Sequence, residues 1–261
     1  MNIKEQQEHI YSKKWHEYQW NGEVLYPVML PLKQVLWGMP YPGAPHMRFA
    51  PKRYNVIGTP RSGTKWMQKI VQMTTGGIAT HGHMGVIGDF KPNHSVIFIY
   101  RDIRDCMLSD YFFIKHGGHC GAMDITSINF NKWGKDAGIA REIITYMKYR
   151  MPVMNYWFHV DAPNVIKVKY EDLVEDREAQ FHIIAKKLNV NLSDKKLKNM
   201  RYETSFQRMS GGRKPGIEVR GRHQRKGVPG DWKNHFTEKH LEMFDQMGGN
   251  DFLKELGYDV D

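Results

Sequence analysis

The sequence predicts an α/β fold with a central parallel sheet flanked by helices. Three short segments, at 54–58, 95–100 and 165–170, predict strands, and each is followed by a segment with helical spacing of its apolar residues. Strands that alternate with helices favour a parallel sheet, because a helix returns the chain to the same edge. Ligands bind such sheets where the carboxyl ends of strands meet helix N-termini. We therefore look for chemistry directly after each predicted strand.

Each predicted element has a pattern of its own. The run SVIFIY at 95–100 is apolar without alternation, as in a strand buried on both faces. The segment at 64–73 carries apolar residues at helical spacing. Thr237 can cap a helix that ends at Gly248 and Gly249. The predicted strands span 54–58, 95–100 and 165–170, and the predicted helices span 64–73, 101–113, 136–160, 175–190 and 238–247.

The composition is that of a globular protein with an anionic partner. Of the 261 residues, 41% are hydrophobic and 25% are charged, which excludes a disordered chain. The net charge of +10 favours a phosphorylated ligand or a polyanion. Two cysteines make no disulfide framework, and no apolar run approaches the roughly 20 residues of a membrane span. We expect a cytoplasmic protein without metal or membrane contact.

The loop after the first predicted strand has the composition of an anion site. Its sequence is GTPRSGTKW, in which Gly58 and Gly63 allow unusual backbone conformations. Arg61 and Lys65 add positive charge, and amides that lead into a helix N-terminus bind anions. The order of residues differs from the Gly-Lys-Ser/Thr of a Walker A loop, which disfavours a nucleotide kinase. An ordinary glycine turn with a solvated arginine is the alternative.

Two further basic clusters follow along the chain. Arg101 ends the second apolar run, and Ser109 lies eight positions later, near the same face of the predicted helix. Arg225, Lys226 and Gly227 stand together in a glycine-containing segment. Taken singly, each cluster is most simply a set of solvated charges. Together with the first loop, they suggest a ligand with two separate phosphate-like groups.

These segments resemble the motifs of the cytosolic sulfotransferases. PRSGTKW is similar to the family's 5′-phosphosulfate loop, and YRDIRDCMLS is similar to its 3′-phosphate motif. Three more segments follow in the family's order, namely YEDL at 170–173, TSFQRM at 204–209 and RKGVPGDWKNHFT at 225–237. The resemblance covers most of 54–245.

The resemblance implies both the fold and the reaction. The fold is the P-loop-kinase-like sulfotransferase fold, as one domain over 1–261, with the donor-binding and catalytic core at 54–245. Residues 1–53 are expected to contribute to the acceptor site. The donor is 3′-phosphoadenosine 5′-phosphosulfate, the product is adenosine 3′,5′-bisphosphate, and the acceptor is a hydroxyl or amine of a small molecule.

The resemblance also implies roles for individual residues. The implied donor-binding residues are Arg61, Ser62, Gly63, Thr64 and Lys65 at the 5′-phosphosulfate, Trp66, Tyr170, Thr204, Ser205, Phe206 and Met209 around the adenine, and Arg101, Ser109, Arg225, Lys226 and Gly227 at the 3′-phosphate. Arg61 and Ser109 are also expected to act in catalysis. For Trp66, Phe206 and Met209, packing in the core is the alternative.

A histidine is expected to be the general base, because sulfuryl transfer requires the acceptor to lose a proton. The family has this histidine in a Lys-Thr-His element at the end of its second strand. Thr80 and His81 match that element, and we predict His81 as the base. His83 is the alternative, as is a purely structural histidine, since the chain has 13 histidines.

Several positions depart from the family pattern. Arg61 replaces a lysine, and Ala79 stands where the family has the lysine of Lys-Thr-His. The interval from Trp66 to His81 is short, which leaves 1–53 and 110–135 to build the acceptor pocket and suggests an open, polar pocket. The candidates for its lining are Trp15, Trp20, Trp37, Phe112, Phe113 and His116.

The dimer element of the family is only partly present. Lys233, Thr237 and Glu242 match it, but Glu238 replaces its valine, so we expect a monomer or a weak homodimer. A basic protein that binds polyanions or nucleic acid is the alternative from another class, and a sulfotransferase acting on a glycan is a narrower variant. The sulfotransferase hypothesis predicts no nucleic-acid partner.

Overall fold

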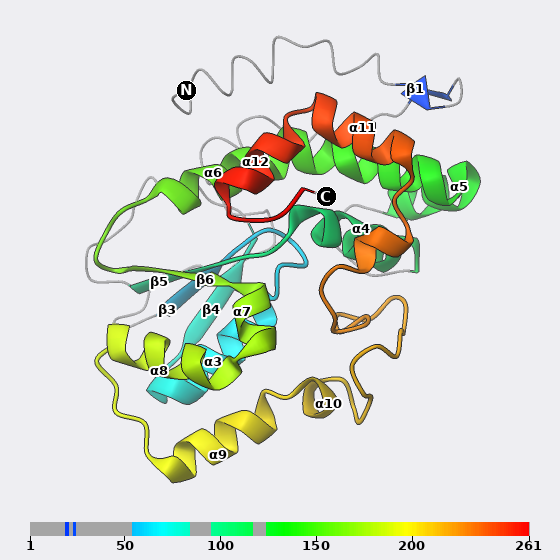
Figure 1. Cartoon of the computed structure of the whole chain (residues 1–261). Coiled ribbons are helices and arrows are strands. Elements are labelled where there is room, and N and C mark those ends of the chain that lie inside the picture. Colours follow the sequence, from blue (N-terminus) through cyan, green and yellow to red (C-terminus); the bar gives the residue numbers. More distant parts are fainter. Residues whose placement is uncertain (1–18, 21–22, 25–53, 84–94, 117–123, 261) are drawn as a thin grey trace.

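Four parallel strands form a sheet at the centre of the described part of the chain (Figure 1). The computed structural model describes residues 19–20, 23–24, 54–83, 95–116 and 124–260. The strand order is β4-β3-β5-β6, and a separate antiparallel pair, β1 and β2, lies nearer the N-terminus. The strands are β1 Gln19–Trp20, β2 Glu23–Val24, β3 Tyr54–Ile57, β4 Ala79–Gly82, β5 Ser95–Tyr100 and β6 Val165–Lys169.

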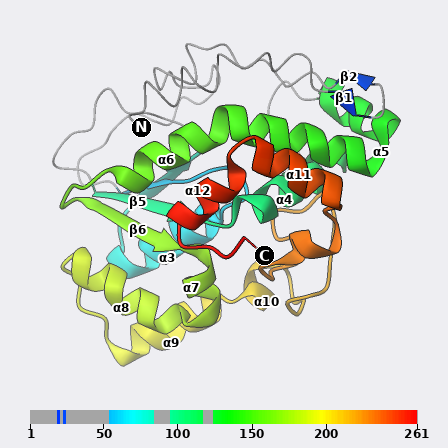
Figure 2. The same ribbon diagram turned by 45° about the horizontal axis from the view of Figure 1, so that its top comes forward.

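Helices cover both faces of the four-stranded sheet (Figures 1 and 2). The described helices are α3 Thr64–Thr75, α4 Ile103–Lys115, α5 Asp124–Thr145, η2 Tyr146–Arg150, α6 Met151–His159, α7 Tyr170–Glu175, α8 Arg177–Lys187, α9 Asp194–Glu203, α10 Phe206–Met209, η3 Asp231–Asn234, α11 Glu238–Gln246 and α12 Gly249–Glu255. None of them is long and apolar enough to cross a membrane.

The core is divided by the sheet into two clusters. Val96 and Phe98 of β5 pack into the cluster that contains α4, α5, α6, α11 and α12. Ile97 and Ile99, which alternate with them, pack into the cluster that contains α3, α7, α8 and α9. This arrangement explains why the SVIFIY run has no polar alternation, since both faces of β5 are buried. Because each face of the sheet is covered by helices, the ends of the strands lie between two layers of helices.

A π-helical turn joins α5 to α6. Pro152 at the start of α6 has no backbone N–H, and its ring would clash with the carbonyl four residues earlier in an α-helix. The wider turn of η2 relieves that clash. Tyr146, the first residue of η2, is buried, and its hydroxyl lies 3.1 Å from the carbonyl oxygen of Pro60. The π-helical turn therefore contacts the loop that follows β3.

The predicted fold class is confirmed, and the three predicted strands and the helices predicted over 64–73, 101–113, 175–190 and 238–247 occur with shifts of up to three residues at their ends. The helix predicted over 136–160 is divided among α5, η2 and α6, and α5 begins twelve residues earlier, with a kink at Gly134. Asp102 caps α4 by accepting from the amide of Arg104 at 2.9 Å, so this helix begins two residues later than predicted. The prediction of one helix over 136–160 missed the π turn within it. The sequence prediction also left out α9 and α12. Helix α12 begins directly after Gly248, which is in the left-handed conformation.

Candidate active site

The loop after β3 delivers backbone amides at the N-terminus of α3. Gly63 is the N-cap residue, with φ +98°, and it has no side chain to occupy the space over the first turn. The first amides of a helix have no partner inside the helix, and the helix dipole attracts anions to them. Arg61 also has a positive φ, +67°, which is uncommon for a residue other than glycine. Such strained residues cluster at ligand sites.

Two glycines let this loop pack against its neighbours. A Cβ atom at Gly58 would lie 2.5 Å from the carbonyl oxygen of Ile99, and one at Gly63 would lie 2.9 Å from the ring of Tyr170. Ser62 is fully buried, and its hydroxyl donates to the carbonyl of Thr59 at 2.8 Å. Its side chain therefore stabilises the loop from inside, and only its backbone remains for a ligand.

Arg61 is held by several groups at once. Its Nε donates to Ser109 Oγ at 3.1 Å, and its guanidinium lies 4.3 Å from the centre of the Phe113 ring. Its Nη2 donates to the carbonyls of Arg222 and His223 at 3.1 and 3.0 Å. Ser109, which the sequence associated with Arg101, therefore lies beside the first loop.

Arg101 lies buried at the end of β5, against the loop and against Asp105. It donates to the carbonyl of Arg61 at 3.3 Å and to the carboxylate of Asp105 at 3.1 Å. Its guanidinium carbon also lies over the ring of Tyr170, 4.3 Å from the ring centre. Asp105 is buried too, and it accepts from the amides of Gly230 and Trp232 at 2.7 and 3.1 Å. One carboxylate thus ties Arg101 to the segment after Gly227.

Arg225 and Lys226 share the buried carboxylate of Asp231. Burial by itself would raise the pKa of Asp231, but hydrogen bonds from Lys226 and Arg225 lower it to about 2. Arg225 also donates to Glu218 at 2.6 Å. Acidic partners therefore hold these two cations in place at the start of the 225–237 segment.

The residues assigned to the adenine come from four separate elements. Trp66 donates to the carbonyl of Thr204 at 2.8 Å, and its ring meets Tyr170 edge-on at 5.5 Å. Thr204 is buried and its hydroxyl donates to the carbonyl of Met200 at 2.7 Å. A Cβ atom at Gly227 would lie 2.3 Å from the ring of Phe206, so only glycine fits there.

Ser205 is the N-cap of the short helix α10, and Met209 is its last residue. Ser205 caps it by accepting from the amide of Arg208 at 3.2 Å, while its hydroxyl donates to the carbonyl of Tyr202 at 2.7 Å. Met209 is half-buried at its last turn. The amide of Met209 donates to the carbonyl of Ser205 at 3.0 Å, so these two residues close the turn that contains Phe206.

His81 lies on β4, opposite Val56 of the neighbouring strand. Burial lowers its pKa below the usual 6.5, and the charge of Lys65 lowers it further. The ring of His83 lies 5.9 Å away. Burial, followed by the charge of Arg150, lowers the pKa of His83 to about 3. Both imidazoles are therefore neutral at pH 7.

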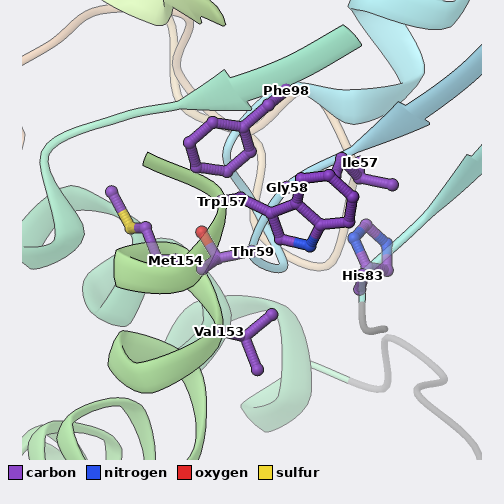
Figure 3. A pocket seen from close by; sticks show the side chains of 8 residues that line it. All are labelled: Ile57, Gly58, Thr59, His83, Phe98, Val153, Met154 and Trp157. Carbon is purple, nitrogen blue, oxygen red and sulfur yellow. The ribbon is translucent and has the colours of Figure 1, made fainter. Parts of the chain in front are cut away.

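A small cavity lies beside His83 (Figure 3). Its volume is only about 10 Å³, and its wall is almost wholly apolar. The buried Nδ1 of His83 has no hydrogen-bond partner among the described residues. The lining residues are Ile57, Gly58, Thr59, His83, Phe98, Val153, Met154 and Trp157.

The residues proposed for the acceptor pocket are only partly described. Trp15 and Trp37 lie outside the described residues, and for Trp20 only the backbone of β1 is described. Phe112 and Phe113 are buried in α4, and Phe113 lies against Arg61.

One residue that the sequence did not single out lies at the centre of this site. His223 contacts both Arg61 and Lys65, at 3.3 and 2.9 Å, and its ring lies 4.9 Å from that of Phe113. Nothing in its spacing marked it, because the segment from 213 to 224 has no regular secondary structure. Only its position two residues before Arg225 could have drawn attention to it.

Comparisons with known proteins agree with the motifs. The family model for the sulfotransferase domain matches residues 77–253, beginning after the 58–66 loop. Luciferin sulfotransferase from Photinus pyralis is 28% identical over an alignment of 188 residues that covers 64% of this chain and 48% of that protein. Sulfotransferase 2A6 from Mus musculus is 26% identical over 166 residues, covering 60% of this chain and 56% of that protein.

A solved structure shares the fold. Mouse sulfotransferase SULT7A1, complexed with PAP, superposes with a TM-score of 0.61 at 18% sequence identity, covering 80% of this chain and 88% of that one. The chain spans about half the length of the curated relatives it matches. Because the family model matches well over half of the chain, this chain belongs to the sulfotransferase-domain family.

Proposed function

We propose that the protein transfers a sulfuryl group from 3′-phosphoadenosine 5′-phosphosulfate to a hydroxyl or amine of a small molecule. The observation that supports this most is that Arg61 and Lys65 converge at the first loop, while Arg101 is tied through Asp105 to the segment that carries Arg225 and Lys226. Two separate sets of cations match a donor that carries phosphate at both ends of adenosine. The donor is the one suggested by the family, and its product PAP, adenosine 3′,5′-bisphosphate, is bound in the mouse relative.

The residues present fit such a donor. The glycine cap of α3 leaves its first amides open to an anion, and Gly227 gives the backbone a close approach to Phe206. We assign the 5′-phosphosulfate to the loop at 58–66, and the 3′-phosphate to Arg101, Arg225 and Lys226. An aromatic ring such as that of Phe206 can stack on a purine.

His81 is the proposed general base. When bound, the donor supplies the sulfuryl group that the acceptor takes. An imidazole nitrogen of His81 accepts the proton of the attacking hydroxyl or amine, while a new bond to sulfur forms in line with the breaking bond to the 5′-phosphate. Arg61, held by Ser109, and the first amides of α3 stabilise the negative charge that develops on the leaving phosphate.

His81 suits this role better than His83. A base is most effective when its pKa lies near the working pH, and the pKa of His83 is lowered to about 3. His83 also lies against an apolar cavity wall, whereas His81 is half-buried beside Lys65.

The pH dependence of His81 tests its environment. Because burial and the charge of Lys65 both lower the pKa of His81, its imidazole should titrate below pH 6.5 in the free protein. Activity should fall as the pH drops through this lowered pKa, because a protonated His81 cannot accept the acceptor's proton. Lys65→Met removes a neighbouring positive charge and should raise the pKa of His81. The measurement is an NMR titration of the His81 ring. Lys69→Met, one turn further along α3, is the control and should leave the titration unchanged.

Binding of adenosine 3′,5′-bisphosphate tests the donor assignment. Calorimetry with the purified protein should show binding, and Lys226→Met should weaken it by about tenfold to a hundredfold, because a charged hydrogen bond contributes about 1.5–3 kcal/mol. Adenosine 5′-phosphate, which has no 3′-phosphate, should bind both proteins equally. Lys187→Met on the exposed surface of α8 removes the same charge and is the control. Absence of binding to the unaltered protein would exclude the proposed donor.

Incubation with labelled donor and fractionated metabolites, followed by mass spectrometry, identifies the acceptor. A labelled product with a sulfated hydroxyl or amine is expected. Transfer only to large glycans would favour the narrower alternative.

A further inference from the structure

His223 lies where the two cations of the first loop meet. Lys65 Nζ is 2.9 Å from Nε2 of its ring, and Arg61 Nη1 is 3.3 Å from Nδ1. The ring is therefore flanked by an ammonium and a guanidinium, one on each nitrogen. A histidine placed in this way interacts with the same two groups that a bound anion would.

The chemistry of a neutral imidazole leaves this arrangement with one ring N–H that neither cation can accept. A neutral imidazole has one nitrogen with a lone pair and one with a hydrogen, whereas ammonium and guanidinium groups only donate. The lone pair serves the nearer cation, Lys65, and the remaining ring N–H then points toward the donors of Arg61. The ring N–H of His223 and the N–H groups of Arg61 could both donate to one acceptor oxygen placed beside them.

The ring is held in this position from several sides. It lies against Phe113 with its centre 4.9 Å from that ring, and Phe113 also supports the guanidinium of Arg61. The carbonyls of Arg222 and His223 accept from Arg61. Burial, together with Lys65 and Arg61, lowers the pKa of His223 to about 4, so the ring is neutral and retains one N–H at pH 7.

We propose that His223 binds the 5′-phosphosulfate end of the donor, its Nδ1–H joining Arg61 on an anionic oxygen while its Nε2 holds Lys65 beside the same group. The inference rests on the proposed function and extends it. Since Arg225 and Lys226 follow directly in the chain, the segment at 223–227 would then contact both ends of the donor. His223 selects for a charged group at the 5′ position, while Lys226 selects for the 3′-phosphate.

The test compares nucleotides that have one phosphate or two. His223→Phe keeps a ring against Phe113 and removes both ring nitrogens. By calorimetry it should weaken adenosine 3′,5′-bisphosphate and adenosine 5′-phosphate by about tenfold to a hundredfold, and leave adenosine 3′-phosphate unchanged. His223→Gln retains a donor and should recover part of the affinity. Lys226→Met should show the opposite selectivity, weakening only the nucleotides with a 3′-phosphate.

The outcomes separate this inference from the proposed function. If His223→Phe weakens all three nucleotides equally, the residue only holds the segment, and the inference is wrong. If it weakens none, the inference is also wrong, while binding to the unaltered protein still supports the donor. If the unaltered protein binds no adenosine 3′,5′-bisphosphate, both fail.

Discussion

Replacing His81 by alanine is expected to lower kcat by about 10² or more, while the affinity for adenosine 3′,5′-bisphosphate stays nearly unchanged. The proposed base acts on the acceptor proton, and it lies on β4, outside the loop and the segment assigned to the nucleotide. Initial rates at saturating donor, with the acceptor that the labelled screen identifies, measure the first quantity, and calorimetry measures the second.

His182 provides a matched control for this experiment. It is exposed on α8, so His182→Ala should leave kcat and nucleotide affinity as they are. A His81→Ala protein with unchanged kcat would reject His81 as the base. A His83→Ala protein that lost activity while His81→Ala kept it would transfer the role to His83.

Replacing Asp105 by alanine is expected to lower the free energy of unfolding by about 3–5 kcal/mol, because it leaves the buried charge of Arg101 without its ion-pair partner. The amides of Gly230 and Trp232 also lose their acceptor. Nucleotide affinity should fall as well, since both Arg101 and the segment that carries Arg225 lose a common anchor. Denaturant unfolding and calorimetry measure the two effects.

A graded series sharpens this prediction. Asp105→Asn keeps an oxygen for the backbone amides but removes the charge, and should fall between the wild type and Asp105→Ala. Asp251→Ala on α12, whose side chain is 92% exposed, should change the unfolding free energy by less than about 0.5 kcal/mol. Equal stability of wild type and Asp105→Ala would contradict the role given to this carboxylate.

The sheet could be predicted because its strands carry their own signal. The run at 95–100 is buried on both faces, so its apolar pattern is continuous, and its predicted bounds agree with β5. Helix α12 was missed because Gly248 ends one helix and allows the next to begin at once. The π turn was missed because it depends on how Pro152 packs within a long helical segment.

The candidate site was predictable to the extent that its residues lie in short motifs. Arg61, Arg101 and Arg225 were singled out because they follow strands or stand near glycines. Arg101 contacts both Asp105 and the carbonyl of Arg61 in the loop, and Arg225 is paired with Asp231. Asp105 and His223 were not singled out. Their importance comes from contacts with residues 125 and 162 positions away, which no local pattern encodes.

The position of β4 in the sheet separates the two halves of the site. In the described sheet β4 pairs with β3 alone, whereas β3 and β5 each have a neighbour on both sides. A substitution on β4 therefore disturbs one ladder of hydrogen bonds, and one on β3 or β5 disturbs two. In the proposed mechanism, nucleotide recognition is anchored in the interior of the sheet and proton removal at its margin, so a change at the margin would alter the use of the acceptor and leave the donor site intact.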